Sequence, residues 1–262
     1  AEEGYGLSEK GIDNVLHEFD AKLIITVDHG ITAWEKVEYG KKLGLDFIIC
    51  DHHVKPEKLP KAEAIIHTVQ LCGAGVAWML ANVILNEVKD LKRDSSATPQ
   101  NDNHLDLAAI ATIADMVPLT GANRILVKEG LKELNQTKRP GLKALIREAG
   151  LENKEIGVYE VSHLLAPRLN AMGRLEHAMD SLRLVCTKDQ NRAQELARLL
   201  NETNRERQDL TQDNLLHARA NSRLRQGFGG QAKLIFIVDD SYNQGVIGLV
   251  AGKLVEEFYR PA

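Results

Sequence analysis

The chain has 262 residues, with 33 Lys and Arg against 37 Asp and Glu, which gives a formal net charge of −4. This balance provides no overall basic field for a polyanion, so any contact with phosphate must come from a local cluster of basic side chains. The length fits one large or two modest domains. Three cysteines without paired spacing fit a reducing compartment, and no signal peptide or apolar run of membrane-spanning length is found, so we expect a cytoplasmic protein without membrane contact.

Two short apolar runs, at residues 23–27 and 47–50, are typical of buried parallel strands, and residues 33–43 between them have helical spacing. Asp28 follows the first run, and Asp51, His52 and His53 follow the second. Ligands of open α/β sheets gather beyond the carboxyl ends of the strands. We therefore expect these side chains to face one crevice.

A third acidic position, Asp115, follows an apolar stretch at residues 107–114 that predicts a buried helix. Carboxylates and imidazole together suit manganese or zinc, so these aspartates and histidines predict a metal site. In the run Asp51-His52-His53, one ring can bind metal while its neighbours orient it or meet substrate. An alternative is that the aspartates are helix N-caps, which is the usual role of a single aspartate after a strand. His29 fits a loop residue beside the site as well as it fits a participant.

The rest of the chain predicts mostly helices. In chain order we expect a polar surface loop at 89–103, two short amphipathic helices within 126–150, one extended connector helix at 189–225, a glycine-rich surface insertion at 226–231, a strand at 234–238 and a helix at 245–258.

Arg168 and Arg174, on either side of Asn170, are the best candidates for holding a phosphate, because planar guanidinium groups suit two-point phosphate contacts. The alternative is that they are ordinary surface arginines. Gly245, at the start of the predicted last helix, could offer backbone N–H groups to a phosphate.

Three segments, 27–31 (VDHGI), 51–53 (DHH) and 111–119 (ATIADMVPL), resemble motifs of the DHH phosphoesterases, and in particular of the bacterial single-strand-specific exonucleases of that family. Further stretches at 3–8, 72–77 and 166–174 resemble the same proteins. The resemblance implies an α/β fold with a parallel-sheet phosphoesterase core at 1–186, a linker helix at 187–226 and the start of a second α/β domain, of the DHHA1 type, at 227–262.

The resemblance also implies a function and a set of roles. It implies 5′-to-3′ hydrolysis of single-stranded DNA by a two-manganese centre, with magnesium as a possible substitute, in DNA repair and recombination alongside a helicase and a single-strand-binding protein. Asp28 would bridge the metals, His52 and Asp115 would complete the shell of the second metal, Asp51 would orient a histidine, and His53 would lie near the scissile phosphate. Arg168, Asn170, Arg174 and Gly245 would bind substrate.

The chain also departs from the family pattern. In the family an Asp-x-Asp strand precedes the segment at 3–8, whereas this sequence starts at Ala1, so we expect a fragment that binds one metal weakly and cuts poorly. The loop at 68–70 is short, and Asn243 stands where the family usually has histidine. Two alternatives remain open: a phosphodiesterase for short oligonucleotides or cyclic dinucleotides, and a catalytically inactive scaffold.

Overall fold

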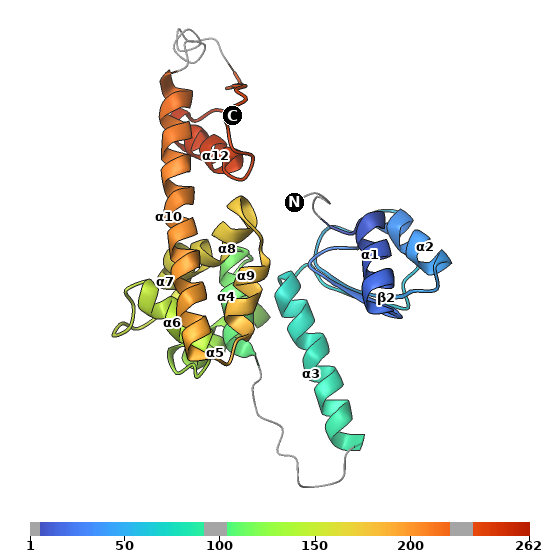
Figure 1. The fold of residues 1–262 in the computed structure, drawn as a ribbon. Helices are drawn as coiled ribbons and strands as arrows, with labels where there is room; N and C mark the ends of the chain where they lie inside the picture. Colours follow the sequence, from blue (N-terminus) through green and yellow to red (C-terminus); the bar gives the residue numbers. More distant parts are fainter. Residues whose placement is uncertain (1–5, 92–103, 221–232) are drawn as a thin grey trace. The chain divides into compact units, whose positions relative to one another are not determined.

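A computed structural model describes residues 6–91, 104–220 and 233–262 (Figure 1). The chain divides into two compact units. The first unit comprises residues 1–137 and 156–162, and the second comprises residues 138–155 and 163–262. The boundaries at 186 and 226 that the sequence favours stay predictions. None of the helices in the described ranges is both long and apolar enough to cross a membrane.

The first unit contains a parallel sheet of three strands, β1 (Leu23–Val27), β2 (Asp46–Asp51) and β3 (Ala64–His67), in the order β1-β2-β3. The strands predicted at 23–27 and 47–50 are confirmed. The register pairs Val27 with Cys50 and Asp51 with His67. The carboxyl ends of all three strands therefore lie at one edge, and polar side chains that follow the strands meet there.

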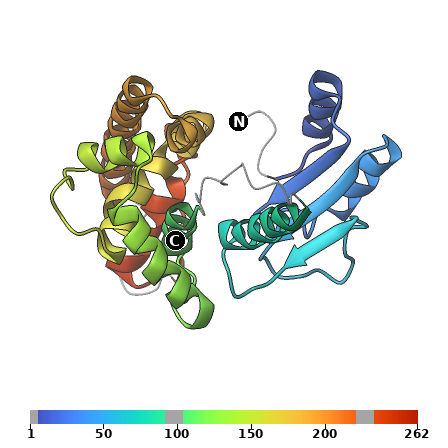
Figure 2. The same cartoon turned by 90° about the horizontal axis from the view of Figure 1, so that it is seen from below.

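Helices cover this sheet (Figure 2). α1 (Glu9–Phe19) and α2 (Trp34–Lys42) pack on the face that carries Phe47 and Ile49, in a core completed by Ile12, Val37 and Leu45. Ser8 caps α1, because its side chain accepts a hydrogen bond from the Gly11 amide. α3 (Gly73–Leu91) packs against all three strands and begins beside the carboxyl edge of the sheet.

The predicted helix before Asp115 is α4 (Leu105–Ala114), which is apolar on almost every side. It packs against α5 (Gly121–Asn135) and α3, with Ala108, Ala109 and Leu126 buried between the helices. Burial on several sides explains why its sequence has no polar stripe. The short helix α7 (Val158–Glu160) follows later in the chain and leads into the π-helix η1 (Val161–Leu165).

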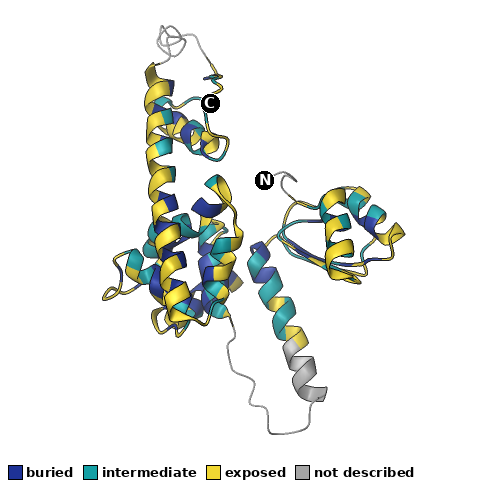
Figure 3. Cartoon of the chain, in the orientation of Figure 1, coloured by how far each residue is buried: buried dark blue, intermediate teal, exposed yellow. Residues whose placement is uncertain are grey.

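The second unit is helical: α6 (Pro140–Glu148), α8 (Ala166–Leu175), α9 (Met179–Cys186), α10 (Gln190–Ala220) and α12 (Ile247–Phe258). The predicted connector helix is α10, whose 31 residues run against each of the other four. Its leucines at 196 and 200 are buried, and most of its charged residues are exposed. Figure 3 shows exposed positions along most of the helix. α10 is therefore a core helix of this unit as well as a connector.

One predicted element does not form as expected. Residues 234–238 run without strand pairing among the described residues, so the predicted strand is wrong here. Ile235 packs with Leu215, Val250 and Leu254, whereas Phe236 is exposed. The alternation is that of a strand, but the hydrogen bond from the Ile235 amide to the Pro261 carbonyl, at 2.8 Å, does not extend into a ladder among the described residues. The glycine-rich stretch at 226–231 and most of the loop at 89–103 lie outside the described residues.

Candidate metal centre

Asp28 sits in a tight turn at the end of β1. Its backbone has φ of 66°, in the left-handed region that few residues other than glycine and asparagine adopt, and its amide donates to the Cys50 carbonyl at 2.9 Å. Gly30, two residues on, has φ of 112°, and a Cβ there would lie 2.6 Å from Oγ1 of Thr26. The turn thus needs Gly30, and it fixes the position of the Asp28 side chain at the carboxyl edge of the sheet.

Asp51 organises the end of β2. Its side chain is 1% exposed, and its Oδ2 accepts a hydrogen bond from the Ile31 amide at 2.8 Å. Its Oδ1 accepts from the amides of His52 and His53 and lies 2.7 Å from Nδ1 of His53. Burial acts to raise the pKa of Asp51, but these hydrogen bonds outweigh it, and the pKa is lowered below its usual value. Asp51 is therefore a structural anion.

Two carboxylates converge on one imidazole nitrogen. Nε2 of His52 lies 2.9 Å from Oδ1 of Asp28 and 3.7 Å from Oδ2 of Asp115. Asp115, directly after α4, keeps 40% of its side chain exposed, so this carboxylate is not buried. Ligand atoms of Asp28, His52 and His53 also lie within 4.8 Å of one another. The first unit thus brings together the three residues that the sequence predicts as metal ligands.

The ring of His53 is half exposed beside this cluster, with its centroid 4.6 Å from that of His52. The hydrogen bond to Asp51 raises the pKa of His53, and burial only partly opposes this effect. Because Nδ1 faces Asp51, Nε2 is the ring nitrogen left for another partner.

Sequence reasoning missed two residues of this site. His67, at the end of β3, lies with Nε2 2.7 Å from the carbonyl oxygen of His53. His67 follows three apolar residues of β3, just as Asp28 follows the apolar run of β1. The same pattern could therefore have placed His67 at this edge of the sheet. Gly73, the first residue of α3, lies against Asp28, and a Cβ there would be 2.6 Å from Cγ of Asp28 and closer still to its Cβ and Oδ1. No sequence pattern shows this contact.

The donor set fits a divalent cation of the manganese or magnesium type. Carboxylate oxygens with an imidazole nitrogen are ligands suited to Mn²⁺, and Mg²⁺ also accepts carboxylate oxygens. The surrounding hydrogen bonds hold the ligands in place, since Asp51 fixes the backbone of both histidines.

The four predicted substrate-binding residues all lie in the second unit. Arg168 is half-buried and donates to the Leu164 carbonyl and to Asn201, while Asn170 is exposed on α8. Nη1 of Arg174 donates to the Gly245 carbonyl at 3.2 Å. The Gly245 amide already donates to Asn243 at 2.8 Å, and a Cβ at Gly245 would overlap with the Arg174 carbonyl. In this structure Gly245 therefore serves close packing against α8.

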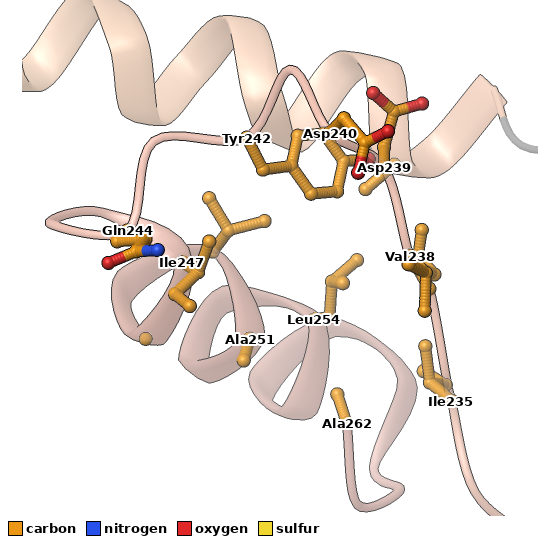
Figure 4. Close-up of a pocket in the computed structure, with 14 residues that line it drawn as sticks. Ile235, Val238, Asp239, Asp240, Tyr242, Gln244, Ile247, Ala251, Leu254 and Ala262 are labelled. Carbon is orange, nitrogen blue, oxygen red and sulfur yellow. The ribbon is translucent and has the colours of Figure 1, made fainter.

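The second unit also contains an apolar pocket of about 560 Å³, between the extended segment at 235–240 and α12 (Figure 4). Ile235, Val250 and Leu254 line its wall, and Asp239 and Tyr242 stand at one end. The hydroxyl of Tyr242 lies 3.0 Å from Nδ1 of His217. Among the described residues, the pocket has no group of three metal-type ligands like that around His52.

Residues 4–112 match the DHH family, N-terminal domain. Over 99% of its length, the chain is 40% identical to the single-stranded-DNA-specific exonuclease RecJ of Bacillus subtilis (strain 168) and 34% identical to that of Escherichia coli (strain K12). It spans only 32% and 47% of those two proteins.

Solved structures agree with these relatives. A crystal structure of exonuclease RecJ bound to manganese superimposes with a TM-score of 0.82 at 32% identity, over 99% of this chain and 64% of that one. RecJ of Thermus thermophilus in complex with Mn²⁺ gives a TM-score of 0.80, over 95% of this chain and 37% of that one. A complex of the same protein with Mg²⁺ gives 0.68. Residues 4–112 therefore form a domain of the DHH family, and the similarity to the RecJ exonucleases extends over nearly the whole chain.

Proposed function

We propose that the chain binds manganese or magnesium through Asp28, His52 and Asp115 and hydrolyses phosphodiester bonds of single-stranded DNA. The observation that carries the proposal is the convergence of two carboxylates on Nε2 of His52, at 2.9 and 3.7 Å. The solved relatives are RecJ complexes with Mn²⁺ or Mg²⁺, and the curated relatives are named as single-stranded-DNA-specific exonucleases, which supports the same chemistry.

Each residue of the cluster has a distinct task in this proposal. Asp28, His52 and Asp115 would hold the cation, and Asp28 would be shared between two cations if two are bound. The metal would supply a Lewis acid that activates water and stabilises charge on the attacking and leaving oxygens. Asp51 holds Nδ1 of His53, so that the Nε2 side of the ring contacts the scissile phosphate. No nucleophilic side chain is needed.

The finer assignments belong to the proposal as well. We assign 5′-to-3′ polarity, a role in DNA repair and recombination, and cytoplasmic partners such as a helicase and a single-strand-binding protein. Arg168, Asn170 and Arg174 would contact the DNA backbone. The internal hydrogen bonds of Arg168 and Arg174 each leave further guanidinium N–H groups for phosphate. Gly245 is a weaker candidate for a contact with the DNA backbone, because it packs closely against α8.

The metal site can be tested by titrating Mn²⁺ into the protein and following its binding by electron paramagnetic resonance. Asp28→Ala and His52→Ala should each weaken affinity about tenfold or more, as expected when one ligand of a small shell is lost. Asp46→Ala and His17→Ala are matched controls, because both side chains belong to exposed residues of the same unit. Equal affinity in all five proteins would contradict the metal site.

The activity can be tested with end-labelled single-stranded and duplex DNA in the presence of Mn²⁺. We expect slow release of mononucleotides from the 5′ end of the single strand, lost in Asp28→Ala, and little attack on the duplex. Metal binding with activity only on dinucleotides would favour a phosphodiesterase for short substrates. Metal binding without any hydrolysis would favour the scaffold.

A further inference from the structure

A buried asparagine in the first unit joins two loops that are far apart in the sequence. Asn123, in the first turn of α5, is only 4% exposed. Its Nδ2 donates hydrogen bonds to the carbonyl oxygen of Gln70 at 2.7 Å and to that of Pro118 at 2.9 Å. Because both neighbours are carbonyl oxygens, which can only accept, the amide nitrogen must face them. One side chain thus uses both of its N–H groups to hold two loops together.

This link is formed at a cost. Oδ1 of Asn123 is buried and has no hydrogen-bond partner among the described residues. Burying a polar atom without a partner opposes folding. An apolar side chain of similar size would avoid that penalty, but it could not donate to either carbonyl. The cost therefore points to a role for the link itself.

The loop that contains Pro118 follows directly after Asp115. Its backbone has little freedom, because Met116 has φ of 55° and Val117 precedes a proline, which itself has a fixed φ. A residue other than glycine stays in the left-handed region only where its surroundings hold it there. The side chain of Met116 provides no such hold, since this residue is 87% exposed. The hydrogen bond from Asn123 holds the turn instead, and through the stiff backbone it fixes the position of Asp115.

The loop that contains Gln70, at residues 68–72, joins β3 to α3 beside the other carboxylate. Gly73 comes directly after this loop and lies against Asp28, so closely that a Cβ there would overlap with it. The same loop also reaches α4, because Sγ of Cys72 lies 3.5 Å from the buried Oγ1 of Thr112. The two hydrogen bonds of the asparagine therefore connect the segment that positions one predicted metal ligand to the segment that positions another.

We propose that Asn123 is a positioning residue of the candidate metal centre, which clamps the turn after Asp115 to the loop beside Asp28. The clamp sets the placement of the two carboxylates that converge on Nε2 of His52, at 2.9 and 3.7 Å. Asn123 acts through Asp115 and does not serve as a ligand. That the carboxylates bind a cation rests on the proposed function, whereas the clamp rests only on the two hydrogen bonds of Asn123.

The first experiment measures amide hydrogen exchange in the metal-free protein. In this turn the Thr120 amide donates to the Pro118 carbonyl at 2.9 Å, so its exchange reports whether the turn is held. Asn123→Ala should speed exchange in peptides that cover residues 116–120. Exchange at the wild-type rate in these peptides would overturn the proposal.

The same helix offers a matched control. Nδ2 of Asn135 also donates to two carbonyl oxygens, those of Leu131 and Ile156, at 2.8 and 2.9 Å. Asn135→Ala should speed exchange around residue 156 and leave residues 116–120 unchanged. Equally fast exchange at 116–120 in both variants would mean that any loosening of α5 reaches the turn, and it would contradict a specific role for Asn123.

The second experiment measures Mn²⁺ affinity by electron paramagnetic resonance in a double-mutant cycle. Asn123→Ala should weaken the affinity about tenfold, as is typical when a residue that orients a metal ligand is lost, and Asn135→Ala should bind like the wild type. In the Asp115→Ala background, Asn123→Ala should cause no further loss, because its effect passes through Asp115. A further tenfold loss in that background, or an equal loss in Asn135→Ala, would show that Asn123 serves the fold in general.

A second variant, Asn123→Ser, covers the case in which Asn123→Ala fails to fold. Its hydroxyl keeps a polar group but has a single O–H, so it cannot donate to both carbonyls, and we expect the same changes in exchange and affinity. Mn²⁺ binding that is unchanged in both variants would contradict this inference and leave the proposed function standing. A wild type that binds no Mn²⁺, with faster exchange at 116–120 in the variants, would contradict the proposed function and support the clamp.

Discussion

At the residue scale, the candidate metal centre depends on residues that cannot themselves bind the metal. Asp51 is buried, and all of its observed hydrogen bonds go to the turn after β1 and to the two histidines. It therefore ties Ile31 to His52 across neighbouring strands. The sequence shows Asp51 as part of a DHH motif. Its role as a buried anion is evident only from its hydrogen bonds in the folded chain.

Gly73 provides the first prediction at this scale. A Cβ at position 73 would overlap with Asp28, so Gly73→Ala should displace Asp28 or the start of α3, destabilise the protein by about 1–3 kcal/mol and weaken Mn²⁺ binding. Gly75→Ala, two residues on in the same helix, meets only the Leu71 side chain and Cys72, no closer than 3.3 Å, and should change neither property much. Chemical denaturation and metal titration of both variants measure these effects.

A double-mutant cycle gives the control. Asp28→Gly removes the atoms that the new Cβ would meet, and glycine tolerates the φ of 66° at this position. If the overlap is the cause, Gly73→Ala should cost little stability in the Asp28→Gly background. The same cost in both backgrounds would show that Gly73 acts through another contact.

At the element scale, the two faces of α10 differ within one turn. Leu200 is fully buried, whereas the adjacent Leu199 is 38% exposed. Leu200→Ala should lower the free energy of unfolding by about 2–5 kcal/mol, because it leaves a cavity in the core of the second unit. Leu199→Ala should stay within about 0.5 kcal/mol of the wild type. Urea denaturation of the two variants compares them, and equal losses would mean that α10 is rotated about its axis relative to this structure.

The helices α1 and α2 are joined by a hydrogen bond that titrates. Tyr39 on α2 donates from its hydroxyl to Oδ1 of Asp13 on α1 at 2.7 Å, and this bond, with burial and the charge of Asp13, raises the pKa of Tyr39. A raised pKa in the folded state means that the bond stabilises the fold below the unfolded value of about 10 and that this contribution is lost as pH rises through the folded pKa.

Tyr39→Phe should therefore be less stable than the wild type near neutral pH, and the difference should shrink at alkaline pH. Thermal melts of both proteins across this range provide the measurement. Tyr259→Phe, at an exposed position, serves as the control. A difference that stays constant with pH would indicate that the phenol contributes by packing and not through its hydrogen bond to Asp13.

At the scale of the whole molecule, the proposed metal ligands all belong to the first unit, which includes residues 1–137. A ligand that binds only the folded state stabilises it by about 2.7 kcal/mol when present at a hundredfold of its dissociation constant. With Mn²⁺ we expect slower amide hydrogen exchange in peptides around Asp28, His52 and Asp115. Peptides from α10 should exchange at unchanged rates. Equal protection of both regions would show that the two units unfold as one.

Much of this protein was determined by its sequence alone. The apolar runs predicted β1 and β2, and helical periodicity predicted the long helix α10, because strand and helix periods follow from local backbone geometry. The positions of Asp28 and His52 after two parallel strands were enough to predict a shared edge. The resemblance of residues 4–112 to the DHH family was also evident from short motifs around these residues.

Other features were decided by the tertiary structure, because they depend on contacts between distant segments. Only the folded chain shows that Gly73 makes room for Asp28, that His67 meets His53, and that Asn204 orients Arg207. The extended segment at 234–238 has the alternation of a strand but finds no pairing partner among the described residues. A sequence pattern specifies which side of a segment is apolar, whereas its hydrogen-bonding neighbours are specified only by what the rest of the chain brings beside it.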